Sequence, residues 1–265
     1  SYGILMSDSK IAIDEKTGLP SLYWQDSKRT AFYNRRGKAE VVGSLVPDFL
    51  GSVATSLSYK NWSLRASFDM RFGGYVASYG SRYGTSYGFT NASLKNTSPE
   101  RGGVTWTSKF DNKTYHDGVI PEGVIAGGTK ITQPNGTQYE VAAGGEVYKD
   151  LFDKGVVEPV HASSWTYRNN SWGQGVINED WIKELDYIAL REVTLNYRLP
   201  QSVASKFNLS SVNLSLTGRN LGYLLNTMPN GENPESVRGT SASEFRVRSF
   251  NGFTANYMFT LNVGF

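Results

Sequence analysis

The last residues of the chain alternate strictly between two kinds of side chain. Every second residue from Phe253 to Phe265 is apolar, and the residues between them are Thr, Asn, Met or Gly. A period of two is that of a β-strand, whose successive side chains point to opposite faces. The run is about twice the roughly 5 to 6 residues of an average strand, and a tilted strand needs about 9 to 11 residues to cross a bilayer. It therefore predicts a membrane-spanning strand that closes a β-barrel.

Four earlier segments alternate in the same way and give an all-β prediction. The first two flank a two-residue turn at Lys60-Asn61, which is typical of a β-hairpin. We expect a single segment over residues 1–265, made of the carboxy-terminal antiparallel strands of a large transmembrane β-barrel. The expected strands lie near 50–60, 62–72, 187–199, 211–222 and 250–265.

The connections between these strands are of two lengths. If Phe265 lies at the periplasmic end, the short connections at 60–61 and 200–210 fall on that side. The long ones, 73–186 and 223–249, then become extracellular loops. A soluble β-sandwich with one apolar face is the alternative, and strand length, loop asymmetry and aromatic residues near both strand ends favour the barrel.

The composition excludes or disfavours several other classes of protein and of site. Mean hydropathy is −0.40, and no run approaches the roughly 18 apolar residues of a transmembrane helix. The chain has no cysteine, which excludes disulfides and thiolate metal sites within it. A net charge of +3, from 27 basic and 24 acidic residues, does not indicate nucleic-acid binding.

Charged residues alternate with the apolar ones along the strands. In a barrel these side chains face the lumen, where we expect mainly mutual ion pairs or contacts to a plug. The predicted lumen-facing residues are Arg65, Asp69, Arg71, Glu192, Arg198 and Arg219.

Aromatic residues gather in the long connection and could stack on sugar rings or grip a peptide. With two neighbouring polar residues they give the candidate substrate-binding set Trp165, Tyr167, Arg168, Asn169 and Trp172. The alternative, which we favour for Tyr167 and for the tryptophans at 106, 165, 172 and 181, is that such rings pack the loop against itself or against a covering protein.

Catalytic and metal chemistry find little support in the sequence. The only histidines are His116 and His161, and no nucleophile motif accompanies the pair His116-Asp117. Asp111, Asp117 and Glu122 lack the spacing of a calcium loop. We expect no enzyme activity, no catalytic residue, no metal and no cofactor.

Several stretches together resemble a known family. They are residues 46–74, 185–200, 214–224, GENPES at 231–236 and the ending LNVGF. In this order they resemble the carboxy-terminal part of SusC/RagA-type TonB-dependent outer-membrane transporters of Bacteroidetes-like bacteria. The family usually has Asp-Pro-Glu where this chain has Asn233-Pro234-Glu235.

The resemblance implies a function and a set of partners. It implies a plugged barrel of roughly 22 strands in the bacterial outer membrane that imports oligosaccharides or peptides. A SusD-like surface lipoprotein would form its lid, and TonB would energise it through a part outside these residues. The plug and the amino-terminal strands would come from the rest of the same transporter, and Phe265 resembles the signal read by the barrel-assembly machinery. The alternative is a non-transporting β-rich surface adhesion or binding module.

Overall fold

In a computed structural model, the chain is described over residues 4–7, 10–36, 40–171, 177–238, 246–247 and 254–265. It divides into two compact units. Unit 1 comprises Ser1–Gly3, Gly43–Val76 and Lys183–Phe265, and unit 2 comprises Ile4–Val42 and Ala77–Ile182.

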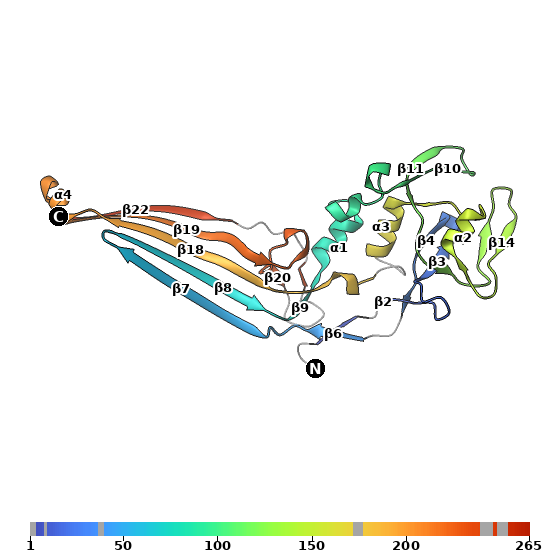
Figure 1. Ribbon diagram of the computed structural model, residues 1–265, viewed down its shortest axis with the longest axis horizontal. Helices are drawn as coiled ribbons and strands as arrows, with labels where there is room; N and C mark the ends of the chain where they lie inside the picture. The colour runs from blue at the N-terminus through green and yellow to red at the C-terminus, as the bar shows by residue number, and fades with distance from the viewer. Residues whose placement is uncertain (1–3, 8–9, 37–39, 172–176, 239–245, 248–253) are drawn as a thin grey trace. The chain divides into compact units, whose positions relative to one another are not determined.

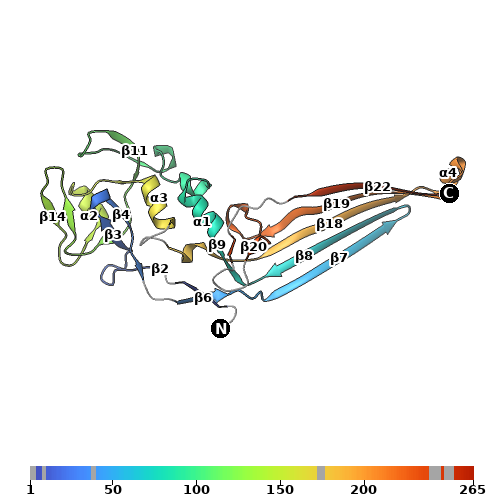
Figure 2. The ribbon, with the colours of Figure 1, turned by 180° about the vertical axis from the view of Figure 1, so that it is seen from behind.

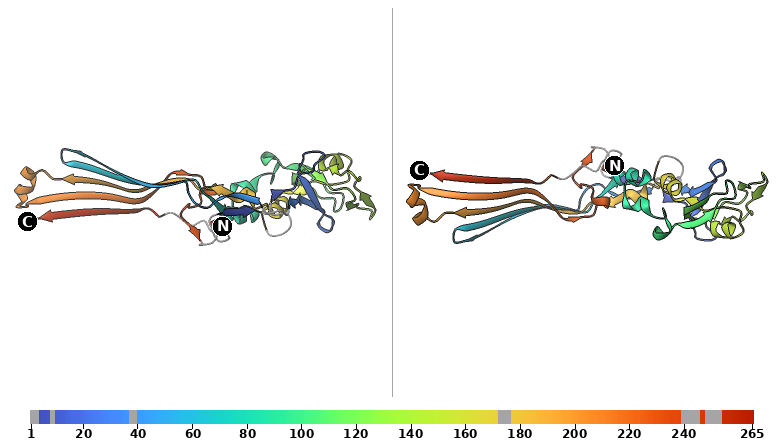
Figure 3. Two further views of the ribbon diagram at one scale, coloured as in Figure 1. Left: turned by 90° about the horizontal axis from the view of Figure 1, so that it is seen from below. Right: turned by 90° about the horizontal axis from the view of Figure 1, so that it is seen from above.

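Unit 1 is built on a five-stranded antiparallel sheet with the order β22-β19-β18-β8-β7. Figure 1 shows these strands side by side, and the two views of Figure 3 place β22 at one edge and the β7–β8 hairpin at the other. The sheet confirms the predicted all-β, antiparallel class. Within the described residues it is open, with β7 and β22 as its edges. Its strands are β7 (Phe49–Tyr59), β8 (Trp62–Phe72), β18 (Tyr187–Arg198), β19 (Ser211–Asn226) and β22 (Asn256–Gly264).

The pairing register brings the apolar residues of all five strands onto one face. One row runs straight across the sheet, because each of its members is the cross-strand partner of the next. A shift of one residue in any strand would turn its apolar side chains to the other face. The row consists of Leu57, Leu64, Leu195, Leu216 and Phe259.

A β-bulge interrupts this register in β18. Leu190 pairs with Phe68 and Glu192 with Ser67, so Arg191 is an extra residue without a counterpart on β8. A bulge re-aims the side chain of its extra residue. Arg191 therefore reaches the polar face, where it contacts Asp69, although strict alternation would turn it to the apolar face.

Unit 2 contains a four-stranded sheet with the order β15-β12-β3-β4. Its strands are β3 (Ser21–Gln25), β4 (Thr30–Tyr33), β12 (Val124–Ile125) and β15 (Glu146–Val147), and β12 pairs with β3 in parallel. The helices α1 (Tyr79–Ser86), α2 (Tyr148–Asp153) and α3 (Ala162–Asn170) belong to the same unit, and Figure 2 shows α2 beside β3 and β4.

The core of unit 2 packs this sheet against α2, and Trp165 of α3 lies at its margin. Tyr148 is fully buried in it and donates its hydroxyl to the Glu158 carbonyl at 2.8 Å. Burial raises the pKa of the Tyr148 phenol, which keeps it neutral and able to donate. The buried members are Leu22, Trp24, Ala31, Ile125, Ile131, Val141, Tyr148, Leu151, Val157 and Val160.

The remaining elements are short. Strands β10 (Val104–Thr107), β11 (Thr114–Val119) and β16 (Val160–His161) form one sheet, and β13 (Lys130–Thr132) pairs with β14 (Gln138–Glu140). The others are β1 (Ile4–Ser7), β2 (Lys10–Ile11), β5 (Arg35–Arg36), β6 (Glu40–Ser44), β9 (Tyr75–Ser78), β17 (Ile182–Glu184), β20 (Val237–Arg238) and β21 (Arg246–Val247). Helix α4 covers Gln201–Ala204, and single 3-10 turns lie at Asp26–Lys28 (η1), Asn91–Leu94 (η2), Pro99–Arg101 (η3), Glu179–Trp181 (η4), Ser205–Phe207 (η5) and Pro229–Gly231 (η6).

The structure differs from the expected loops in two places. Residues 73–186 are not one irregular loop, because most of them fold with residues 4–42 into unit 2 around a common core. Its strands are only two to six residues long, and some of them pair across a large sequence separation, as β12 does with β3, so a local period could not reveal them. The second difference is at the end of β19, which continues to Asn226, beyond the expected end at 222. Part of the expected loop 223–249 and the first residues of the expected strand 250–265 lie outside the described residues.

No helix in the described part of the chain is long and apolar enough to cross a membrane.

Candidate functional site

The apolar face of the five-stranded sheet is exposed over most of its length. Leu57 is 70% exposed, Leu216 54% and Phe259 67%, although they belong to one continuous row. Soluble proteins rarely leave a patch of this kind open to water, and such a patch marks a surface that meets a partner or a membrane. Further exposed members are Val53, Leu64, Leu195, Tyr257 and Leu261.

Aromatic rings lie at both ends of the strands. Where β7 turns into β8, Trp62 stacks on Tyr197 with their ring centroids 4.4 Å apart. Towards the opposite end, Phe49 lies 6.2 Å from Phe72. Aromatic girdles at the two levels where strands leave the hydrocarbon are typical of membrane barrels.

The opposite face of the sheet is polar and contains the residues predicted to face a lumen. Arg65, Asp69 and Arg71 alternate along β8. Glu192 is the cross-strand partner of Arg219, and its carboxylate accepts a hydrogen bond from the Arg219 guanidinium at 2.8 Å. The predicted mutual ion pairing therefore occurs at this pair, and the lumen itself stays a prediction.

The other three arginines predicted on this face have different surroundings. Arg71 donates to the Leu45 carbonyl at 3.1 Å, and Arg65 pairs in register with Thr194. Arg198 lies at the β7–β8 turn end of the sheet, where it lines a depression of about 500 Å³ together with Lys60.

A cluster around Arg191 was not predicted from the sequence. The Arg191 Nε donates to Asp69 at 2.5 Å, its Nη1 donates to Glu235 at 2.7 Å, and its Nη2 donates to the second oxygen of Glu235. This guanidinium contact holds the pKa of the Glu235 carboxyl below its usual range. The available signal was the pair of consecutive charges Arg191-Glu192, which breaks the alternation and indicates a bulge.

Asn233 joins this cluster through its side-chain oxygen. The Asn233 Oδ1 accepts hydrogen bonds from the Tyr223 hydroxyl at 2.8 Å and from the Glu235 N–H at 2.9 Å. Both contacts need an acceptor and neither needs a charge. Asparagine therefore provides here the same acceptor oxygen that an aspartate at this position would provide.

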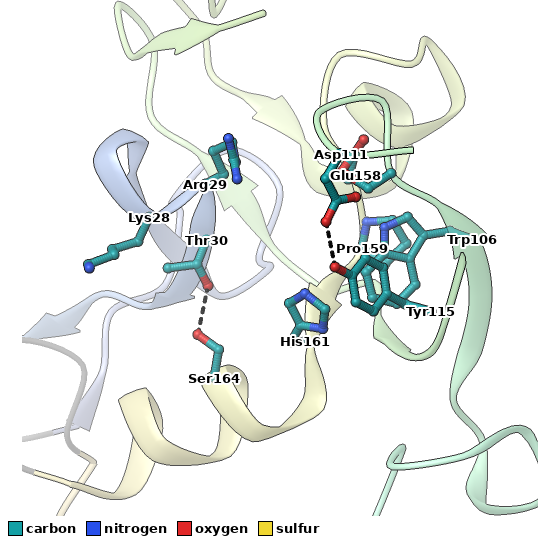
Figure 4. Close-up of a pocket in the computed structure, with 11 residues that line it drawn as sticks. Lys28, Arg29, Thr30, Trp106, Asp111, Tyr115, Glu158, Pro159, His161 and Ser164 are labelled. Atoms are coloured by element: carbon teal, nitrogen blue, oxygen red, sulfur yellow. Dashed lines mark hydrogen bonds between the residues drawn. The ribbon is translucent and has the colours of Figure 1, made fainter. Parts of the chain in front are cut away.

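Unit 2 has a small, partly open cavity of about 110 Å³ next to α3 (Figure 4). Three rings pack together on one side of it, with Tyr115 edge-on to His161 at 4.7 Å between ring centroids and Trp106 5.0 Å from His161. The Thr30 and Ser164 hydroxyls, 3.3 Å apart, close another side, and Lys28 and Arg29 also contribute.

A second, wider hollow of about 770 Å³ adjoins this cavity, and we call it the α1–α3 groove. The two share Lys28, His161 and Ser164. The volume of the groove lies within the roughly 300 to 1,000 Å³ of ordinary ligand sites. Its other lining residues are Thr85, Ser86, Tyr87, Gly88, Ser93, Leu94, Thr97, Ser163, Thr166, Tyr167 and Arg168.

The predicted substrate-binding residues divide into two groups. Tyr167 and Arg168 line the groove. Trp165 instead packs edge-on against Tyr33 at 4.8 Å between ring centroids. Asn169 is only 7% exposed and accepts the Tyr33 N–H at 3.0 Å, so Trp165 and Asn169 hold α3 against β4. Trp172 lies outside the described residues.

The two histidines have separate polar partners. His116 lies 3.0 Å from the Thr105 hydroxyl, whereas Asp117 lies 3.1 Å from His161. The sequence neighbours His116 and Asp117 do not act as a pair, because consecutive residues of β11 point to opposite faces. No group of three or more metal-ligating side chains occurs among the described residues.

Comparison with known proteins gives similarities in structure only. No family model and no curated protein matches the chain. The structure of the RagAB peptide importer in its open-open state covers the whole chain at 14% identity and a TM-score of 0.46. The closed-closed state covers the whole chain at 13% identity with the same TM-score, and a RagAB peptide transporter structure covers 98% at 12% and 0.46. The chain spans 22 to 25% of the length of these proteins.

Proposed function

We propose that this chain is the carboxy-terminal barrel segment of a TonB-dependent importer of the bacterial outer membrane. The observation that carries the proposal is the division of the five-stranded sheet into two faces. One face is apolar and exposed, and the other bears charges and ion pairs. A strand between lipid and a polar lumen needs this division, with strands of nine to sixteen residues.

The open edges of the sheet indicate what completes it. β7 and β22 present unpaired backbone groups within the described residues, and unpaired edges are not tolerated in lipid. Further strands of the same transporter would pair with them and would bring the plug and the TonB contact. The family resemblance adds a SusD-like lipoprotein as the lid.

Unit 2 would then be the external part that meets the imported oligosaccharide or peptide. It is formed by Ile4–Val42 together with Ala77–Ile182, and it has its own core and groove. The same observation favours the second candidate, a non-transporting surface binding module. A transporter requires a plug domain encoded upstream and uptake that depends on TonB, whereas a binding module requires neither.

Two adjacent residues of β19 test the orientation of the sheet. Leu216→Arg in the full-length protein places a charge on the apolar face and should cost about 2 to 4 kcal/mol near the bilayer midplane. Ser215→Arg places the same charge on the polar face and should assemble normally. The measurement is the amount of folded, heat-modifiable protein in the outer-membrane fraction. Equal assembly of the two variants would refute the orientation.

A further inference from the structure

The charges that line the α1–α3 groove have one sign. Lys28 and Arg168 contribute cations, and no carboxylate is among the lining residues. Neither cation takes part in an ion pair among the described residues. Arg168 is half-buried, with its guanidinium 5.9 Å from the Phe32 ring centroid. The groove is therefore suited to an anion.

The walls of the groove combine hydroxyls with tyrosine rings. Tyr87 and Tyr167 meet edge-on, 6.0 Å apart, and remain 56% and 41% exposed. Exposed rings of this kind offer flat apolar surface, and their hydroxyls and those of the neighbouring Ser and Thr residues offer donors and acceptors. A sugar ring has the same two aspects, an apolar face and a rim of hydroxyls.

One polar atom in the groove is left unsatisfied. Ser86 is only 7% exposed, and its hydroxyl has no hydrogen-bond partner among the residues described. A buried hydroxyl without a partner is costly, and the cost is relieved if a ligand supplies the missing group. Ser86 lines the groove.

The groove is poorly suited to an extended peptide. Peptides commonly bind by adding a strand to an exposed sheet edge. The one strand that contributes to the lining is β16, which has two residues, and the other lining residues lie in helices, 3-10 turns and connections. The adjoining cavity of about 110 Å³ is lined by the carboxylates of Asp111 and Glu158 as well as by Lys28 and Arg29, so it offers room for water and the acidic groups of a ligand stay in the groove.

We propose that the α1–α3 groove binds an acidic saccharide, a chain of sugar rings carrying carboxylate or sulfate groups. Arg168 and Lys28 pair with the acidic groups, Tyr167 and Tyr87 each offer a face on which a sugar ring can stack, and Ser86 bonds a ring hydroxyl. This inference rests on the proposed function, because it names the ligand class of the external unit.

The test uses the full-length protein purified in detergent, with oligogalacturonate and its methyl ester as probes in calorimetry. The free acid should bind at least tenfold more tightly than the ester. Added salt should lower the affinity for the acid but not for the ester, because salt screens the charge pairs that only the acid forms. Arg168→Gln should weaken binding of the acid about tenfold, because a charge-assisted hydrogen bond is lost. Arg168→Lys should restore most of the affinity.

Lys130→Gln is the matched control, because Lys130 is an exposed cation of the same unit outside the groove. It should bind like the parent protein. If Arg168→Gln fails to fold, Lys28→Gln at an exposed side chain provides a second variant with the same expected direction. Equal affinity for acid and ester, or equal effects of Arg168→Gln and Lys130→Gln, would overturn the inference. If an oligoglutamate peptide bound more tightly than oligogalacturonate, the inferred saccharide ligand would be wrong and the groove would be a site for an acidic peptide.

Failure of the inference and failure of the proposed function are distinguishable. Fractionation of the cells tests only the outer-membrane location, and calorimetry on the purified protein tests only the ligand. A correctly located protein without preference for the acid would leave the proposed function intact.

Discussion

Replacement of Arg191 by alanine removes the cation that joins the sheet to the segment after β19. In the structure the guanidinium bridges Asp69 of β8 and Glu235, which lies beyond η6. The substitution leaves two carboxylates close to each other without their shared partner. We therefore expect the segment around Glu235 to open more readily, with little change in the strands.

The size of the effect follows from the exposure of the three side chains. Breaking a fully buried ion pair costs about 3 to 5 kcal/mol, whereas an exposed pair contributes about 0.2 to 1 kcal/mol. The Arg191 side chain is 23% exposed, that of Asp69 39% and that of Glu235 32%, which places the cluster between these limits. We expect about 2 kcal/mol, or roughly thirtyfold faster amide exchange where local opening controls it.

Hydrogen exchange with mass spectrometry on the full-length protein measures this directly. The reporters are the amides of Glu232, Glu235 and Ser236, which donate to acceptors within the same segment. Arg219→Ala is the matched control, because the Arg219 side chain is 60% exposed and its ion pair with Glu192 should contribute less than about 1 kcal/mol. Equal exchange in Arg191→Ala and the parent protein, or equal effects of the two variants, would refute the reasoning.

Three further predictions concern single groups. Asn233→Asp should leave exchange of the Glu235 amide within about twofold, whereas Asn233→Ala should accelerate it several-fold, because only an acceptor oxygen is needed there. The lowered pKa of Glu235 means that the Arg191 contact is fully formed above the ordinary glutamate pKa of 4.5 and is lost as pH falls through the lower folded value. Protease resistance of the segment should therefore be constant from pH 7 to about pH 5 and fall in more acidic solution; a decline centred above pH 5 would contradict this. Asp26→Ala should destabilise unit 2 by about 1 to 3 kcal/mol in denaturant unfolding, since Asp26 accepts hydrogen bonds from Trp24 and from the N–H and hydroxyl of Thr132, and an unchanged midpoint would contradict that role.

The sheet of unit 1 could be read from the sequence because its strands carry one repeated local signal. In β8 an apolar residue follows a polar one for the whole strand, and the strand occupies 62–72, the range expected. The signal fails where the geometry is not periodic. The bulge at Arg191 adds one residue to β18, so a charge that alternation would place on the apolar face lies instead on the polar face.

Unit 2 could not be read in this way. Its central pair, β12 and β3, is parallel, and Val124 lies opposite Ser21 far away in the sequence. Strands of two residues carry no period, and the buried residues of this core become visible only when the distant segments meet.

Only some residues that line the α1–α3 groove could be named from the sequence. Tyr167 and Arg168 were identified as a possible ligand surface, and both line the α1–α3 groove. Trp165 and Asn169 belong to the same helix but face β4, because one turn of α3 divides its residues between the groove and the core. Composition alone could not separate the two sides.

The most direct measurement of the central claim is the lipid exposure of consecutive residues of β22. These 265 residues contain no cysteine. Once any cysteine elsewhere in the full-length protein has been replaced, single cysteines at Tyr257, Met258, Phe259, Thr260 and Leu261 can carry a fluorescent label. After reconstitution with brominated lipids, labels at Tyr257, Phe259 and Leu261 should be strongly quenched, and labels at Met258 and Thr260 should not. Uniform quenching, or equal access of all five positions to a water-soluble maleimide, would contradict a strand that separates lipid from a polar lumen.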